Sequence, residues 1–218
     1  MHKRLIIFPF GGNGREALVS LSAINKAKKE WDILGFIDDD QATWGKECCG
    51  VRVIGGRNFL SSYPDASVLA VPGNPNDFLK RKEIIEGLGI APSRFATIID
   101  PTAVIAPGAR IGRNVLIMAH VFVSTGVTVG DHCIILPSTV ISHDSSLGAY
   151  SCVGSNVSVS GRVRIGESCY VGTGTKIRGG IAVGTRTLLG LGSVVVSDIG
   201  EGVVAYGNPA KAAKEAGR

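Results

Sequence analysis

Several features common in proteins are scarce or missing in this sequence of 218 residues. Aromatic residues make up 6 % of it, and no arginine-rich stripe is interleaved with them, so we expect no nucleic-acid partner. The apolar run that follows the basic start ends at Phe10, which is too short for the core of a signal peptide. No other apolar stretch approaches the length that crosses a bilayer, so we expect no membrane span.

Cysteine is also scarce, and its spacing gives no sign of metal binding. The five cysteines are an odd number without paired metal-ligand spacing, which favours a chain kept in a reducing cytoplasm. The net charge of +5 is a mild excess, and the basic residues are spread along the chain rather than clustered. An excess of this kind suits anionic small molecules such as nucleotides or coenzyme A.

The dominant feature that is present is a six-residue repeat of aliphatic residues. Every sixth residue from Ile99 to Val195 is Ile, Leu or Val, without an exception over 17 positions. A fixed period this short is typical of a β-solenoid built from hexapeptides, whereas a helix would need a 3.6-residue period. The aliphatic positions are Ile99, Ile105, Ile111, Ile117, Val123, Val129, Ile135, Ile141, Leu147, Val153, Val159, Ile165, Val171, Ile177, Val183, Leu189 and Val195.

Each hexapeptide reads as one short strand followed by one turn. Glycine often follows the aliphatic residue, where it lets the chain turn at low steric cost, and the position four after the aliphatic residue is small or β-branched. Three hexapeptides then make a triangular coil of 18 residues, and the aliphatic side chains fill the prism as coils stack about 4.8 Å apart. Cys133 and Cys169 fall on the small inward position, so we expect them to be core residues.

The first part of the chain lacks this period and alternates strands with helices. A strand, a glycine-rich turn, a helix and a second strand that ends in acidic residues are typical of a small doubly wound α/β unit. We therefore expect an N-terminal Rossmann-like α/β domain with a parallel sheet. The expected strands are 3–8, 31–37, 51–54 and 67–71, and the expected helices are 15–29 and 76–88.

Ligands of such units bind outside the carboxyl ends of the strands, where this chain has a glycine turn. The turn, Gly11-Gly12-Asn13-Gly14, lacks the G-x-G-x-x-G pattern, so nucleotide-sugar recognition, NAD binding and a tight turn without a ligand all stay open. Backbone N–H groups at the start of the helix favour an anion, and Asp38 or Asp39 can accept hydrogen bonds from a ribose or a base. The candidate substrate-binding residues are Gly11, Gly12, Asn13, Asp38, Asp39 and Gly73.

Five segments carry a resemblance to a known family. They are 9–16 (PFGGNGRE), 35–40 (GFIDDD), 70–74 (AVPGN), 141–144 (ISHD) and 207–211 (GNPAK). With an α/β cap ahead of the hexapeptides, the chain resembles the sialic acid O-acetyltransferase family of the NeuD type, which includes the sugar N-acetyltransferases PglD and PerB. The resemblance covers nearly the whole chain and implies a left-handed parallel β-helix, an exception to the usual right-handed crossover.

The domains expected on this basis are three. Residues 1–98 would form the α/β domain that binds a nucleotide sugar, and residues 99–199 the left-handed β-helix with the acyltransferase activity. Residues 200–218 would form a C-terminal tail.

The resemblance implies an acetyl-CoA-dependent enzyme with a histidine general base. That histidine is His143, and Asp144 is the acid that raises its basicity. An attacking amine must lose a proton, which suits an imidazole, and a carboxylate beside the imidazole stabilises the imidazolium. Neighbouring residues on a strand point opposite ways, so direct contact between the pair requires a turn. No metal is expected, because His120, His132 and His143 lack the close pair that the zinc site of hexapeptide carbonic anhydrases needs.

The stacking of coils gives the position beside the base. Residues 18 apart lie one coil apart on the same edge, so Gly161 is the neighbour of His143. A backbone N–H there can hold the acetyl carbonyl or its oxyanion, and the family has an acetyl-CoA contact at this position. The family's other coenzyme contacts map onto Thr173 and Leu191, and its second histidine, which touches acetyl-CoA, maps onto Cys152.

We therefore expect an N-acetyltransferase that acts on a nucleotide-linked amino sugar in bacterial glycan biosynthesis, with acetyl-CoA as acyl donor. Asn13 stands where the turn of the family often has His, which leaves the identity of the substrate open. O-acetylation of a sialic acid or another sugar hydroxyl, a non-catalytic binding trimer and a nucleotide-dependent oxidoreductase stay as alternatives. Hexapeptide enzymes are generally trimers with the coenzyme between two prisms, so we expect a cytoplasmic homotrimer.

Overall fold

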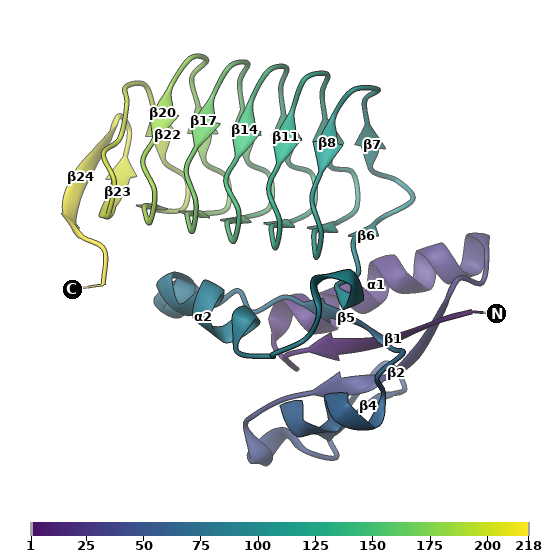
Figure 1. The fold of residues 1–218 in the computed structure, drawn as a ribbon. Coiled ribbons are helices and arrows are strands. Elements are labelled where there is room, and N and C mark those ends of the chain that lie inside the picture. Colours follow the sequence, from purple (N-terminus) through teal and green to yellow (C-terminus); the bar gives the residue numbers. More distant parts are fainter. Residues whose placement is uncertain (1, 218) are drawn as a thin grey trace.

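A computed structural model describes residues 2–217 of the protein. An N-terminal unit of strands and helices, here called the cap, packs beside a long β-helix (Figure 1). The N terminus lies in the cap, and the C terminus follows the last coil of the β-helix. None of the helices in residues 2–217 is long and apolar enough to cross a membrane.

The hexapeptides fold as two-residue strands that form three sheets. Strands of one sheet are 18 residues apart and parallel, as in the pairing of Phe122 with Val104 and with Val140. This is the coil expected from the sequence. The sheet here called the apolar sheet contains β7 (Val104–Ile105), β10 (Phe122–Val123), β13 (Val140–Ile141), β16 (Ser158–Val159), β19 (Lys176–Ile177) and β22 (Val194–Val195).

The other two sheets are here called the polar sheet, after its outward residues, and the cap-side sheet, after the cap that packs on it. The polar sheet contains β8 (Arg110–Ile111), β11 (Thr128–Val129), β14 (Ser146–Leu147), β17 (Arg164–Ile165) and β20 (Ala182–Val183). The cap-side sheet contains β6 (Ile98–Ile99), β9 (Leu116–Ile117), β12 (Ile134–Ile135), β15 (Cys152–Val153), β18 (Tyr170–Val171) and β21 (Leu188–Leu189). An antiparallel hairpin of β23 (Val203–Gly207) and β24 (Ala210–Glu215) extends the cap-side sheet.

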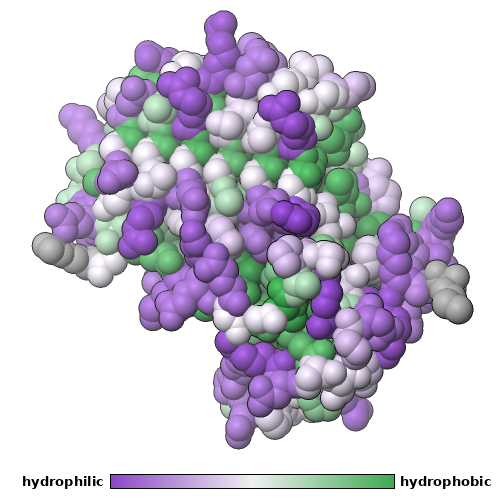
Figure 2. Space-filling model, viewed as in Figure 1, coloured by the Kyte–Doolittle hydropathy of each residue, from purple (hydrophilic) through white to green (hydrophobic). Residues whose placement is uncertain are grey.

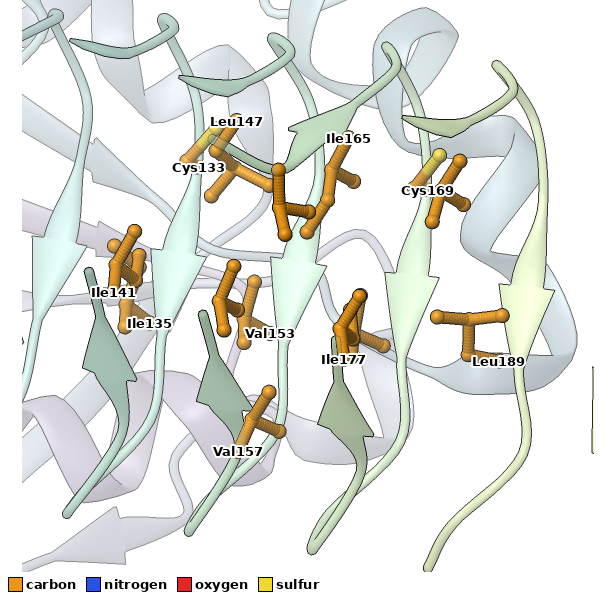
Figure 3. Close-up of a cluster of buried hydrophobic side chains, with 14 of the residues drawn as sticks. Cys133, Ile135, Ile141, Leu147, Val153, Val157, Ile165, Cys169, Ile177 and Leu189 are labelled. Atoms are coloured by element: carbon orange, nitrogen blue, oxygen red, sulfur yellow. The ribbon is translucent and has the colours of Figure 1, made fainter. Parts of the chain in front are cut away.

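The second residue of each of these two-residue strands in the β-helix points into the prism and is one of the 17 repeated aliphatic residues. Those from Ile117 onward are buried, and the close-up shows several of them meeting inside the coils (Figure 3). Cys133 and Cys169 lie among them with no exposed surface, which confirms them as core residues. Truncating one such isoleucine or leucine side chain to alanine costs about 2–5 kcal/mol.

The cap has a five-stranded sheet with the order β3-β4-β2-β1-β5. Its strands are β1 (Lys3–Phe8), β2 (Trp31–Ile37), β3 (Glu47–Cys48), β4 (Val51–Gly55) and β5 (Ser67–Ala70). Its helices are α1 (Gly12–Ala27), α2 (Arg81–Glu86) and the 3-10 helices η1 (Gln41–Thr43), η2 (Arg57–Ser62), η3 (Pro75–Lys80) and η4 (Pro92–Arg94).

The structure corrects the predicted fold class. The cap sheet is mixed rather than parallel, because β3 and β4 form an antiparallel hairpin. The cap is also too short for a doubly wound domain: α1 is its only long helix among the described residues, and η3 and a short α2 replace the helix expected over 76–88. The strand every six residues is consistent with a left-handed β-helix of hexapeptide repeats, but a separate Rossmann-like domain does not precede it.

The cap and the β-helix share one buried cluster. Leu5 and Phe36 of the cap sheet and Leu21 of α1 belong to the same cluster as Leu116 and Ile134 of the cap-side sheet. The last two are the first residues of their strands and point out of the prism toward the cap. The boundaries predicted at 98/99 and 199/200 stay predictions.

The outward positions of the other two sheets differ in character. In the apolar sheet they include Val104, Phe122 and Val140, which are exposed side by side. In the polar sheet they include Arg110 and Thr128, which are paired across neighbouring coils. Figure 2 shows rows of hydrophobic residues that cross the coils on the side of the molecule it presents, between hydrophilic residues.

Candidate active site

His143 and Asp144 form a turn at the corner between β13 and β14. Asp144 has a φ of +60°, a left-handed conformation that Asp tolerates better than most residues. The turn brings the two side chains together, with His143 Nδ1 at 2.9 Å from Asp144 Oδ2. Both side chains remain accessible, at 54 % and 63 % exposure. The sequence predicted that His143 and Asp144 can touch only if they lie at a turn. The structure has both the turn and the contact.

Glycines flank this pair in the two neighbouring coils. A Cβ on Gly161, one coil after His143, would lie 2.6 Å from Cε1 of the His143 ring. A Cβ on Gly126, one coil before Asp144, would lie 2.5 Å from Asp144 Oδ1. Both side chains thus lie over bare backbone. Gly126 was missed from the sequence, although the same interval of 18 residues that identified Gly161 points to it.

The backbone beside the imidazole offers a hydrogen-bond donor. The Gly161 carbonyl accepts a bond from Gly180 N–H at 3.0 Å, but the Gly161 N–H has no acceptor within the described part of the chain. Ser145 braces the same corner from inside: its hydroxyl donates to the Ser160 carbonyl at 3.0 Å and accepts from Val163 N–H at 3.1 Å. The corner therefore holds a base, an acid and a free N–H on a rigid frame.

A second candidate site is a cleft of about 250 Å³ in the cap. Four of the six predicted substrate-binding residues line it: Gly11, Gly12, Asn13 and Gly73. A Cβ on Gly73 would overlap Asn13 Nδ2, so a larger residue there would displace the Asn13 side chain from its place in the cleft. Gly12 is the first residue of α1, so the cleft receives the positive end of that helix.

The other two predicted residues do not line this cleft. Asp38 accepts hydrogen bonds from Phe10 N–H and Asp40 N–H, both at 2.9 Å. Asp39 accepts hydrogen bonds from the Arg57 side chain, which hold the pKa of Asp39 below its usual range. Both carboxylates have internal partners, and their contact with a ribose or a base stays a prediction.

The predicted coenzyme contacts are divided between surface and interior. Thr173 and Leu191 lie one coil apart on one corner, and both are exposed, Leu191 to 83 %. Cys152 lies in the cluster between cap and β-helix with no exposed surface, and burial raises the pKa of its thiol. The structure therefore does not offer Cys152 to a ligand at the surface of this chain, whereas Thr173 and Leu191 are accessible.

The base and the cleft lie on different sides of one chain. The corner with His143 joins the apolar sheet to the polar sheet, and the cap packs on the third side of the prism. Each coil is a triangle, so this corner is the vertex opposite the cap-side sheet. A substrate held in the cleft therefore has the whole β-helix between it and His143 of the same chain.

Besides Asp77, sequence reasoning missed a second charged residue of the cleft, Arg81. In the sequence it stands in a basic stretch with Lys80 and Lys82, which reads as a solvated helix face. In the structure its exposure is 1 %. Within residues 2–217 no three His, Cys, Asp or Glu side chains come close enough to hold a metal ion.

Comparisons with known proteins agree with this architecture. The family model described as the GMPPB C-terminal domain matches residues 94–201. No curated protein sequence matches the chain. The acetyltransferase domain of PglB from Neisseria gonorrhoeae superposes with a TM-score of 0.85 at 29 % identity, over 97 % of this chain and 100 % of that chain. A second structure of that domain contains acetyl coenzyme A.

PerB from Caulobacter crescentus, solved with CoA and GDP-perosamine, superposes with a TM-score of 0.83 at 28 % identity, over 98 % of either chain. The matches run over nearly the full length of both partners. The cap and the β-helix therefore recur in these relatives as one unit, and not as a separate Rossmann-like domain followed by a β-helix. The resemblance inferred from the sequence is thereby confirmed: over nearly its whole length the chain is similar to hexapeptide-repeat acetyltransferases of the NeuD/PglD/PerB type.

Proposed function

We propose that this protein transfers the acetyl group of acetyl-CoA to the amino group of a nucleotide-linked sugar in bacterial glycan biosynthesis. The observation that carries the proposal is the His143–Asp144 pair on an accessible corner with the free N–H of Gly161 beside the ring. Acetyl-CoA supplies the acetyl group as an activated thioester. The relatives solved with CoA or acetyl coenzyme A support this choice of donor.

His143 acts as the general base through Nε2. Because Nδ1 lies 2.9 Å from the Asp144 carboxylate, Nδ1 carries the proton of the neutral ring and Nε2 presents its lone pair to the amine. As the amine nitrogen bonds to the thioester carbon, Nε2 takes the amine proton and Asp144 stabilises the imidazolium. The C–S bond then breaks, the thiolate takes the proton back from His143, and CoA leaves as the thiol.

Gly161 stabilises the charge that develops on the carbonyl oxygen. Its N–H is free to donate, and no side chain stands between it and the ring of His143. A fixed N–H aimed at an oxyanion is the usual device for this purpose. Thr173 and Leu191, on a corner that borders the apolar sheet, are placed to contact the coenzyme as it runs along the prism.

The site is completed by a second chain of a homotrimer. In one chain the cleft and His143 lie on opposite sides of the prism, so the sugar bound by one cap has to reach the corner of a neighbour. The exposed row of Val104, Phe122 and Val140 supports the apolar sheet as the face between copies. Closed three-fold symmetry lets each chain contribute one cap and one base to three equivalent sites.

The proposed substrate site is the cleft with Gly11, Gly12, Asn13 and Gly73. It combines the start of α1 with close backbone approach, which suits the phosphates of a nucleotide sugar. We place the enzyme in the cytoplasm, where nucleotide sugars and acetyl-CoA are made. The five free cysteines agree with that compartment.

Release of CoA thiol from acetyl-CoA tests the proposal. The acceptors are UDP-, GDP- and dTDP-linked amino sugars and free sialic acid, and the proteins are the wild type, His143→Ala and His120→Ala. His120 is the matched control, because it is an exposed histidine in a turn on another corner of the prism. We expect turnover on one nucleotide-linked amino sugar, lost in His143→Ala and kept in His120→Ala.

Three other outcomes would change the account. Turnover on sialic acid alone would move the assignment to O-acetylation with the same base. Full activity of His143→Ala would remove the proposed mechanism. Binding of acetyl-CoA without turnover on any acceptor would favour a non-catalytic trimer.

A further inference from the structure

Arg81 is a buried cation without an acidic partner. Its exposure is 1 %, and among the described residues no carboxylate forms an ion pair with it. It binds the β-helix side-on: Nε donates to the Tyr150 carbonyl at 2.9 Å and Nη2 to the His132 carbonyl at 2.7 Å. Nη1 is buried and has no hydrogen-bond partner at all. A buried charge in this state is costly unless something pairs with it.

The free nitrogen faces away from these two carbonyls. In a planar guanidinium, Nε and Nη2 share one edge, so Nη1 lies on the other side of the group. Arg81 lines the cap cleft together with Gly11, Gly12 and Asn74. The cleft thus receives two positive features from different elements: the guanidinium of α2 and the start of α1, whose N-cap Gly11 supplies no side-chain acceptor.

One acid also lines the cleft, and it is already engaged. Asp77 lies 3.4 Å from Lys80 Nζ and accepts a hydrogen bond from Asn74 Nδ2 at 3.3 Å. It is not paired with Arg81. The negative charge that would pair with the buried guanidinium therefore has to come from a ligand.

We propose that Nη1 of Arg81 binds an anionic oxygen of the sugar substrate, a phosphate oxygen of the nucleotide diphosphate, and so selects substrates that carry one. The inference rests on the proposed function and adds a specificity-determining residue to it. The cleft of about 250 Å³ is smaller than a whole nucleotide sugar, so it holds the anionic part while the amino sugar extends toward the neighbouring chain. A carboxylate of an acidic sugar offers the same oxyanion chemistry, and the experiment separates the two sources.

The test is calorimetric titration of the full-length assembly with matched pairs of ligands. UDP, GDP and dTDP are each compared with their nucleosides, and sialic acid with its methyl ester. The variant is Arg81→Met, and the control is Arg94→Met. Arg94 also binds two carbonyls side-on, Ala66 at 3.0 Å and Tyr63 at 2.8 Å, but it does not line the cleft.

We expect the wild type to bind one nucleoside diphosphate about tenfold or more tightly than its nucleoside, as charge-assisted hydrogen bonds allow. Arg81→Met should lose most of this ratio of diphosphate affinity to nucleoside affinity. It should keep its affinity for the nucleoside and for acetyl-CoA. Arg94→Met should keep the ratio. An unchanged ratio in Arg81→Met overturns the inference and leaves the proposed function intact.

Two further arms keep the inference testable if Arg81→Met misfolds. Arg81→Lys keeps the charge but lacks the planar guanidinium that can bond to both carbonyls and a ligand at once, so it should lose the ratio too. Inorganic pyrophosphate should displace the diphosphate from the wild type, and failure to do so overturns the inference. The wild type could instead prefer sialic acid over its ester, lose that preference in Arg81→Met, and show no preference for any diphosphate. That result would assign the oxyanion bound by Nη1 to a carboxylate and overturn the nucleotide part of the proposed function.

Discussion

The imidazole of His143 lies against the backbone of Gly161, where a Cβ would stand 2.6 Å from Cε1 and 3.0 Å from Cδ2 of the ring. We predict that Gly161→Ala pushes the ring out of place and lowers kcat by about 100-fold or more, the share of a general base. Gly200→Ala is the control, because a Cβ there meets nothing within 4 Å. Steady-state kinetics with acetyl-CoA and the amino sugar check this, and a kcat near that of the wild type would contradict it.

The contact between His143 and Asp144 fixes the tautomer of the imidazole. Asp144→Asn keeps a residue that tolerates the φ of +60° but removes the charge that stabilises the imidazolium. We predict that kcat falls about tenfold or more and that the KM for acetyl-CoA changes little, because proton transfer alone is weakened. Pre-steady-state and steady-state kinetics measure both. A variant that changes KM alone would show that Asp144 serves binding instead.

Phe122 stands between Val104 and Val140 in the exposed row of the apolar sheet. We predict that Phe122→Glu separates the trimer, because a carboxylate would have to be buried between copies. Thr128→Glu on the polar sheet of the same coil is the control and should leave the trimer intact. Light scattering after size exclusion gives the mass of each variant. A Phe122→Glu trimer would place the interface elsewhere.

His132 holds the cap to the β-helix in its neutral form. Asn114 Nδ2 lies 3.0 Å from His132 Nδ1, and the same amide pairs with both backbone groups of Ala70 in β5. Because an amide nitrogen only donates, Nδ1 has to accept. Burial is the main cause that lowers the pKa of His132.

The pH dependence of stability follows from that shift. The unfolded chain binds a proton at the ordinary histidine pKa of about 6.5, above the lowered value of the folded state. Stability is therefore intact above the pKa of the unfolded state. It falls as the pH drops from there toward the pKa of His132 in the folded state, because the unfolded state binds more protons. We predict that His132→Gln flattens the loss between pH 7 and 5 in urea denaturation, and that His120→Gln does not. Parallel slopes for wild type and His132→Gln would refute this.

The β-helix could be predicted in detail because its information is local. The period of six specifies which residue of each strand points inward, and the interval of 18 identified Gly161 as the neighbour of His143. The same arithmetic could have sorted the outward faces. Leu116, Ile134 and Cys152 form an apolar series that marks the side covered by the cap.

The cap was harder to predict because its features depend on turns and on contacts distant in the sequence. Cys49 and Gly50 have positive φ and close the antiparallel hairpin that makes the sheet mixed. The helix expected over 76–88 breaks at Asp77, whose φ of −120° is not helical. The partners of Arg81 lie 51 and 69 residues further along the chain, so no local pattern reveals that it is buried.

The central claim is that His143 of one chain acts on a sugar held by the cap of another, and complementation tests it most directly. Gly12→Glu closes the cleft with a carboxylate, since Gly12 lines it and a Cβ there meets nothing within 4 Å. Gly12→Glu and His143→Ala are each expected to be inactive alone. If they are co-expressed and mix at random, about a quarter of the interfacial sites combine an intact cap with an intact base, so about a quarter of wild-type activity should return. Activity no greater than that of the two variants measured separately would contradict the account.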